Sequence, residues 1–380
     1  MKRGYVKLYV LGISMFVLLL ANLFIFKIAN PYIISGLLFL FLIATIITLG
    51  IEKDNFRYKK DVFLNIVIIL LIYYFLTYFF GLFTGFLKSS YSLKLVNIFK
   101  NAFPILLVIV LSEFLRYIWV SKSKENKIGL IVGYLGFLLI DVCLMLNTYD
   151  ITSALGLTKM ICLVVFPSIT KNILLTYVTY KVGYKNCIFY RIIVDLSVYI
   201  LPLFPDFGEY INVILETVLP IIIVIRLNNL FNYYDLRKIK ESRYTKKNLI
   251  IYSVITFALL VIVTLTSGYF RYYALTIGSG SMTPKINKGD VVIVKKLKDT
   301  EIYDIKKGDI LVYNHDDKII VHRVNKIIKN NGQINFKTKG DNNNTADSWQ
   351  VKQDEVIGIV KFKIRYIGMP TVALNELLNG

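Results

Sequence analysis

Apolar residues form long runs over the first two thirds of the chain and short alternating segments after residue 268. Runs of about 16 to 25 residues are long enough to cross a bilayer as helices. Such runs occur at 8–26, 31–50, 62–86, 101–120, 128–147, 160–180, 189–204, 210–226 and 249–267. The pattern predicts a polytopic α-helical membrane region of about eight spans at 1–227, a basic cytoplasmic linker at 228–248 and a membrane anchor span at 249–267.

The last third has the pattern of a β domain. β-branched and aromatic residues recur in short stretches between turn residues, at Val291–Lys296, Ile310–Asn314, Ile319–Ile328, Ile334–Lys339 and Val356–Ile367. Two of these stretches follow the related sequences Lys288-Gly289-Asp290 and Lys307-Gly308-Asp309. Both predict turns, because glycine tolerates a positive φ and aspartate can bond the following backbone. We expect a mostly β domain at 268–367 and a short tail at 368–380 that packs as a helix or lies at an interface.

Composition supports a membrane protein. Hydrophobic residues make up 56% of the chain and the mean hydropathy is +0.58, both outside the soluble globular range. The net charge is +20, yet residues 268–380 carry 18 basic and 12 acidic side chains, so +14 belongs to the apolar part. No aromatic-basic motif accompanies this charge, and we expect no nucleic-acid partner. Cysteines occur only at 143, 162 and 187, in or beside predicted spans, which offers neither a disulfide framework nor a zinc site.

The charge distribution predicts which side of the membrane each loop faces. Nineteen Lys and Arg side chains, Arg191 among them, lie in or beside alternate loops that include the N-terminus, against five in the intervening loops. Cytoplasmic loops carry the excess of basic residues. We therefore expect a multi-pass plasma-membrane protein with a cytoplasmic N-terminus. An odd number of spans places the β domain on the extracytoplasmic side.

Three short motifs place a serine, a histidine and carboxylates in the β domain, namely Ser279-Gly280-Ser281-Met282-Thr283-Pro284, Ile320-Val321-His322-Arg323-Val324 and Gly340-Asp341-Asn342-Asn343. A serine hydroxyl needs a nearby base, and donors for the oxyanion that forms on its substrate. Ser281 follows a glycine, where the backbone can turn tightly and expose the side chain. The Ser279 hydroxyl and the Ser281 amide are candidate oxyanion donors. This constellation suggests a peptidase.

His322 is the better candidate base of the two histidines. Its β-branched neighbours predict a stiff strand that points it to one face, whereas His315 lies in a polar stretch typical of a solvated turn. An imidazole can act as a base near neutral pH without heavy desolvation. Asp341 and Asp347 are the candidates to orient it, and the residues alone leave that choice open. The spacing from Asp341 to Asp347 imitates a calcium loop, but the glycine and glutamate of such a loop are absent.

Together the three motifs resemble the signal peptidase I family, and most closely its ER, archaeal and sporulation-type branch, in which a histidine replaces the lysine of the main bacterial branch. The resemblance covers about residues 272 to 365. It implies Ser281 as the nucleophile, His322 as the general base, Asp347 as the orienting acid and Asp341 as a supporting acid.

The family's substrates are exported preproteins, cut after small residues in an Ala-x-Ala pattern on the outer face of the membrane. The resemblance therefore implies preproteins and the lipid bilayer as partners, the secretion translocon as a further candidate partner, and neither a metal nor an organic cofactor. It also implies a membrane-bound serine endopeptidase. Family members usually carry one or two spans, and the additional eight predicted here fall outside the resemblance.

Two alternatives remain from the sequence. The chain could be a polytopic transporter or scaffold whose exported module is an inactive peptidase used for binding, or a self-cleaving peptidase related to repressor-type enzymes. Ionisable residues within the predicted spans would be costly in lipid and are expected to face a bundle interior or an interface, where structural pairing competes with a transport or proton path. They are Glu113, Arg116, Asp141, Lys171, Asp195 and Glu216.

Overall fold

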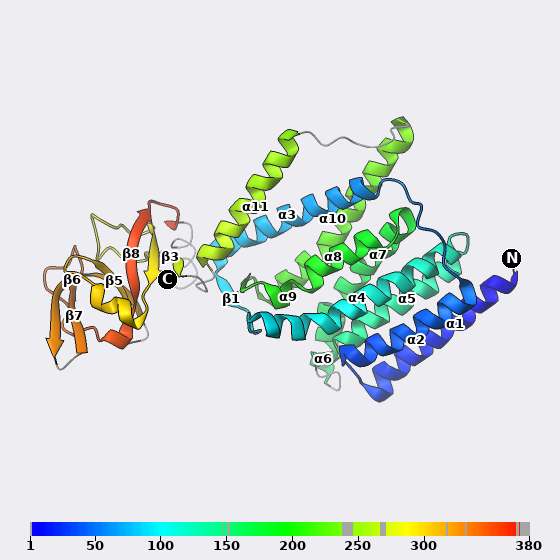
Figure 1. Ribbon diagram of the computed structural model, residues 1–380, viewed down its shortest axis with the longest axis horizontal. Coiled ribbons are helices and arrows are strands. Elements are labelled where there is room, and N and C mark those ends of the chain that lie inside the picture. Colours follow the sequence, from blue (N-terminus) through cyan, green and yellow to red (C-terminus); the bar gives the residue numbers. More distant parts are fainter. Residues whose placement is uncertain are drawn as a thin grey trace. The chain divides into compact units, whose positions relative to one another are not determined.

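The computed structural model describes residues 2–146, 148–149, 153–237, 246–266, 271–316, 318–330, 333–369 and 372 (Figure 1). The chain divides into two compact units. The first comprises Met1–Tyr73, Ser89–Leu201 and Phe207–Tyr252, and the second comprises Tyr74–Lys88, Pro202–Asp206 and Ser253–Gly380.

Helices account for most of the apolar part of the chain. They are α1 (Lys2–Ala21) with η1 (Asn22–Phe26), α2 (Pro31–Leu49), α3 (Lys59–Thr84), α4 (Leu95–Ser123), α5 (Lys127–Leu144), α6 (Ala154–Met160) with η2 (Ile161–Val165), α7 (Phe166–Val182), α8 (Lys185–Asp195), α9 (Ser197–Ile200), α10 (Gly208–Arg237) and α11 (Lys246–Thr266). Within the described residues, seven helices are long and apolar enough to cross a membrane, and α11 adds the shorter apolar stretch Ser253–Thr266.

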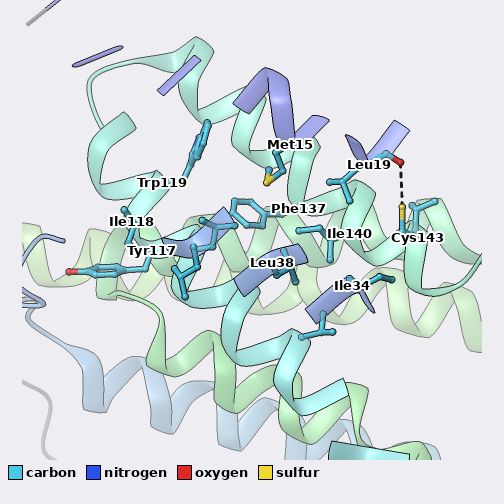
Figure 2. Packing of buried hydrophobic residues seen from close by; sticks show 14 of the residues in the cluster. Met15, Leu19, Ile34, Leu38, Tyr117, Ile118, Trp119, Phe137, Ile140 and Cys143 are labelled. Carbon is cyan, nitrogen blue, oxygen red and sulfur yellow. Dashed lines mark hydrogen bonds between the residues drawn. The ribbon is translucent and has the colours of Figure 1, made fainter. Parts of the chain in front are cut away.

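One group of helices, α1, α2, α4 and α5, shares an apolar cluster (Figure 2). The approach of these helices depends on small residues of α5. A Cβ added at Gly133 would overlap the ring of Trp119, and one added at Gly136 would overlap Met15. The buried indole N–H of Trp119 donates to the Gly129 carbonyl at 2.8 Å. Small residues that let helix backbones approach closely are typical of helix packing within membranes.

A second apolar cluster is formed by α3, α7, α8 and α10. Buried ion pairs join the helices of the two clusters. Arg191 on α8 donates to Glu113 on α4 at 3.0 Å, to Asp141 on α5 at 3.1 Å and to Asp195 at 2.8 Å. Arg191 is fully buried, although the sequence analysis counted it beside a cytoplasmic loop. Ion pairs with three carboxylates offset the cost of burying its charge.

The network extends through a second arginine. Arg116 pairs with Glu113 at 3.0 Å and donates to Asn172 on α7 at 2.7 Å. Lys171 contacts Asp141 at 3.2 Å and Asp195 at 3.7 Å. Five of the six ionisable residues expected in the interior or at an interface therefore pair with one another, the arrangement that offsets the cost of burying charge. The sixth, Glu216, is exposed on α10.

The apolar run at 189–204 differs from the single helix that its length predicts. It contains parts of α8 and α9 and ends in the short strand β2 (Leu203–Pro205), which pairs with β1 (Phe86–Lys88). Pro202 explains the end of α9, because proline disfavours a helical conformation in the preceding residue, and Leu201 is extended. At the predicted linker, α10 continues to Arg237, while residues 238–245 lie outside the described residues, as does most of the predicted tail.

The β part of the second unit, named the β unit and spanning residues 272–364, is one antiparallel sheet with the strand order β3-β4-β8-β5-β6-β7 (Figure 1). Its strands are β3 (Tyr272–Thr276), β4 (Val291–Lys296), β5 (Ile310–His315), β6 (Lys318–Asn330), β7 (Gln333–Lys339) and β8 (Val356–Ile364), with 3-10 turns at η3 (Asp299–Asp304) and η4 (Gln353–Glu355). The five predicted strands are confirmed to within a few residues. The prediction missed β3, an edge strand that pairs only with β4.

The two Gly-Asp sequences form equivalent turns. Gly289 and Gly308 have φ values of 84° and 96°, as expected for glycine at a turn. The aspartates, however, bond the preceding backbone and not the following one. Asp290 accepts from the Asn287 amide at 3.0 Å, and Asp309 accepts from the Lys306 amide at 2.8 Å. Each carboxylate thus closes its turn three residues back and starts the next strand.

Candidate active site

Three neighbouring strands present polar side chains on one face of the sheet. His322 on β6 lies opposite Leu311, and Tyr313 lies two residues further along β5. Thr338 on β7 lies opposite Val324, two residues after His322. Because side chains two residues apart share a face, Tyr313, His322 and Thr338 point to the same side. The loop that follows β7 brings Asp347 to them.

Asp347 is the carboxylate that contacts His322. Its Oδ2 lies 2.8 Å from Nδ1 of the imidazole, and both residues are only 7% exposed. A carboxylate can only accept, so Nδ1 carries the proton and Nε2 is left as the basic nitrogen. The amide of Asp347 donates to the Thr338 carbonyl at 3.0 Å, which ties the loop to β7. This arrangement orients the ring and fixes its tautomer.

Ser281 sits in a loop that is held from two sides. Met282, which is 1% exposed, anchors the loop in an apolar cluster with Ile277 and Ile286. On the other side, the Ser281 carbonyl accepts the Asn342 amide at 2.8 Å. The Ser281 side chain remains partly exposed, and its hydroxyl lies 3.3 Å from that of Ser279.

A cavity of about 500 Å³ brings the serines and the histidine together, because Ser279, Ser281 and His322 all line it. Within the described residues, no hydrogen bond joins Ser281 to His322. Such contacts are often long without substrate and tighten when it binds. A serine hydroxyl, an imidazole oriented by a carboxylate and adjacent donors at one cavity can together perform acyl transfer.

Asp341 has a different partner. Its carboxylate accepts two hydrogen bonds from Arg323, at 2.7 and 2.6 Å, and Arg323 also donates to the Gly308 carbonyl at 2.6 Å. These bonds from Arg323 lower the pKa of Asp341 below its usual range. Since Arg323 follows His322 and Asp341 precedes Asn342, the pair connects the strand of the histidine to the loop that binds Ser281.

Asp341→Asn is expected to destabilise the β unit by about 1 to 2 kcal/mol at pH 7, as for loss of a charged hydrogen bond. The folded-state pKa of Asp341 is below the unfolded value, so its stabilisation is complete above about pH 4 and is lost as the pH falls through the folded-state pKa. The difference from the parent should therefore shrink on acidification.

Urea unfolding of the full chain in detergent would measure this effect. Of the two tryptophans, only Trp349 lies in the β unit, so a Trp119→Phe background makes it the reporter. Asp304→Asn, which changes an exposed carboxylate on η3, is the matched control. A loss of stability that is equal at pH 7 and at pH 3 would contradict the ionic origin of the effect.

Sequence reasoning missed three side chains of this site. Its motif predicts no role for Arg323, and no motif includes Tyr313 or Thr338. Both hydroxyls contact Asp347 Oδ2, at 3.2 and 2.6 Å. No single-sequence signal marks them, because their convergence depends on the register of three strands. His315 lies elsewhere, stacked on Trp349 with the ring centroids 4.6 Å apart.

The part of the chain that contains these residues is similar to known peptidases. Residues 256–361 match the family described as Peptidase S24-like. Signal peptidase I W of Bacillus subtilis (strain 168) is 37% identical over 108 residues, which cover 27% of this chain and 56% of that protein. The signal peptidase complex catalytic subunit SEC11C is 32% identical over 162 residues in both Canis lupus familiaris and Homo sapiens, covering 37% of this chain and 78% of each subunit.

The similarity thus spans just over half of the bacterial relative and more than three quarters of the SEC11C subunits. These relatives cover 27% and 37% of this chain, and the family match begins at residue 256, within α11. The matched family segment includes β3 to β7 and most of β8, with Ser281, His322 and Asp347. By its β unit, the chain belongs to the signal peptidase I family.

Proposed function

We propose that this chain is a membrane-bound serine endopeptidase that removes signal peptides from exported preproteins. Ser281 is the nucleophile, His322 the general base and Asp347 the acid that orients it, while Asp341 supports the loop of Ser281. The observation that carries the proposal is the 2.8 Å contact between His322 Nδ1 and Asp347 Oδ2 beside a cavity that Ser281 also lines.

In the proposed reaction, His322 Nε2 removes the proton of the Ser281 hydroxyl as Oγ attacks the scissile carbonyl. The Ser281 amide and the Ser279 hydroxyl donate to the oxyanion. The imidazolium then protonates the leaving amine, and the signal peptide stays as an ester on Ser281. Water, deprotonated by His322, hydrolyses this ester and returns the free serine.

The residues that line the cavity favour small, uncharged substrate side chains. Apart from its polar end, its walls are apolar and are contributed mainly by Leu275, Ile277, Met282, Ile320 and Val321. Among the residues that line it there is no lysine, arginine, aspartate or glutamate. A charged substrate side chain would therefore be desolvated without a partner. This is consistent with cleavage after small residues in an Ala-x-Ala pattern.

We place the helical part in the plasma membrane, with its bilayer lipids as partners. The stretch from Lys185 to Ile200 is about 24 Å long at 1.5 Å per residue, shorter than a hydrocarbon core. Still, Asn186 contacts the Lys59 carbonyl at the start of α3, and β2 pairs with the strand that follows α3. The segment from α8 to β2 therefore runs between the same two ends as α3, and we count it as a crossing.

With this crossing, the path from α1 to α11 makes nine crossings, an odd number. The loops on the side of the N-terminus still contain more Lys and Arg than the opposite loops when the buried Arg191 is left out of the count. We infer a cytoplasmic N-terminus from the basic excess, and with an odd number of crossings the β unit then lies on the outer side. Preproteins that emerge from the secretion translocon, the further partner proposed here, would meet Ser281 on that outer face.

A covalent probe tests activity and location together. The probe is an Ala-x-Ala peptide with a C-terminal serine-reactive phosphonate and a charged tag that does not cross membranes. We expect it to label the parent chain on intact cells and to leave Ser281→Ala unlabelled. Labelling only after lysis would overturn the outer location. Equal labelling of the parent and Ser281→Ala, or none of either, would overturn the proposed nucleophile and favour an inactive binding module.

A further inference from the structure

Two buried hydroxyls hold the carboxylate that contacts His322. Thr338 Oγ1 lies 2.6 Å from Asp347 Oδ2, the Tyr313 hydroxyl lies 3.2 Å from the same oxygen, and the two hydroxyls are 3.1 Å apart. Both residues are 0% exposed. They come from the strands on either side of β6, which carries His322.

The direction of these bonds follows from the chemistry of the groups. An ionised carboxylate only accepts, so Thr338 donates to Asp347, and Tyr313 donates to Asp347 or to Thr338. Burial raises the pKa of Tyr313 to about 12, so its hydroxyl keeps its proton at any working pH. Asp347 Oδ2 therefore receives the imidazole N–H and the Thr338 hydroxyl, and Tyr313 donates either to the same oxygen or to Thr338.

We propose that Thr338 and Tyr313 are positioning residues for the reaction. This inference rests on the proposed function and adds to it two side chains that do not touch the substrate. They hold Asp347 in the orientation in which it accepts the Nδ1 proton of His322, and so leave Nε2 free for Ser281. Thr338 has the larger effect because its contact is shorter and direct, and Tyr313 supports both Thr338 and Asp347.

The hydroxyl of Thr338 can be tested almost without a change of shape. Thr338→Val removes the hydroxyl and keeps the volume, whereas Thr338→Ser keeps the hydroxyl and removes a methyl. With the full chain in detergent and a preprotein substrate, we expect Thr338→Val to lower kcat by roughly 10- to 100-fold, the range for loss of a group that orients a functional side chain. KM should stay within about twofold, since substrate binding is untouched.

Thr338→Ser should retain kcat within about threefold of the parent because the donor is restored. Tyr313→Phe should show a smaller loss of kcat than Thr338→Val, again at constant KM. Tyr273→Phe is the matched control, because it removes a hydroxyl from a half-buried tyrosine of the same sheet that does not contact Asp347.

Several outcomes would overturn the positioning role. These are an unchanged kcat in Thr338→Val, an equal loss in the Val and Ser variants, a loss confined to KM, or an equal loss in Tyr273→Phe. If Thr338→Val does not fold, the kcat and KM of Tyr313→Phe test the positioning role instead. Ser281→Ala separates the two proposals: if it cleaves like the parent, the proposed function fails, whereas an inactive Ser281→Ala beside a fully active Thr338→Val overturns the positioning role alone.

Discussion

Ser281→Ala is expected to lower kcat for preprotein cleavage by about 10⁴- to 10⁶-fold, the range seen when a serine nucleophile is removed from an oriented triad. The proposed ester forms on the Ser281 hydroxyl, which this variant removes. His322→Ala should cause a loss of similar size, because the serine hydroxyl is then left without a base. The two losses should not multiply in the double variant, since the residues act as a unit.

The measurement is cleavage of a purified preprotein by the full chain in detergent, followed by the appearance of the mature protein. Ser279→Ala is the informative control. Its hydroxyl lies 3.3 Å from that of Ser281 and is proposed only as an oxyanion donor, so its loss should cost about 10²- to 10³-fold at most. If Ser281→Ala cleaves as well as the parent, or if Ser279→Ala is the more damaging change, the assignment of the nucleophile is wrong.

The local pattern of the chain was sufficient to predict most of its elements. The β-branched stretches at Val291–Lys296 and Ile334–Lys339 correspond to β4 and β7 within one residue. Burial alternates along β7, whereas Val291 to Val294 of β4 are all buried. Edge strand β3 was missed, since it packs against only one neighbour and its sequence carries a weaker pattern. The run at 189–204 was apolar enough for a span, but the effect of Pro202 on Leu201 ended its helix early.

The candidate site could be predicted only as far as its motifs reach. Ser281 and His322 follow from residue type and local context, and both line one cavity. Two carboxylates with similar neighbours offered no local basis for choosing between them. The partners of each aspartate decide between them. The Thr338 carbonyl on β7 accepts the Asp347 amide and holds that loop beside His322, whereas Arg323 on β6 binds the Asp341 carboxylate. The contacts of these side chains depend on the pairing of three strands, which the local pattern around each aspartate does not specify.

Arg191 illustrates the same limit in the helical part. Counting basic residues by their distance from apolar runs put it beside a loop, whereas the structure buries it against Glu113, Asp141 and Asp195. Asp195 lies on the same helix as Arg191, whereas Glu113 and Asp141 are 78 and 50 residues away in sequence. Removing Arg191 alone would leave Glu113 with Arg116, and both Asp141 and Asp195 with Lys171, so three carboxylates would share two cations in a low-dielectric environment. These ion pairs therefore connect the two helix clusters.

The two aspartates should respond differently to the same change. Asp347→Asn is expected to lower kcat by about 10²- to 10⁴-fold, because a neutral amide cannot stabilise the imidazolium and can donate to Nδ1, which selects the wrong tautomer. Asp341→Asn should lower kcat by about tenfold or less, since its carboxylate contacts Arg323 and acts on Ser281 only through the Asn342 amide. Both variants are nearly isosteric with the parent.

The contrast is informative because each variant controls for the other. Asp341→Asn should lose stability, as argued from its bidentate pair, and keep most of its rate, whereas Asp347→Asn should lose rate at nearly constant KM. The kinetics of the full chain in detergent, together with its unfolding midpoint, separate the two. A larger loss of kcat in Asp341→Asn would mean that Asp341 orients His322 during the reaction. The Asp347 contact at 2.8 Å would then belong to a resting arrangement that substrate binding replaces.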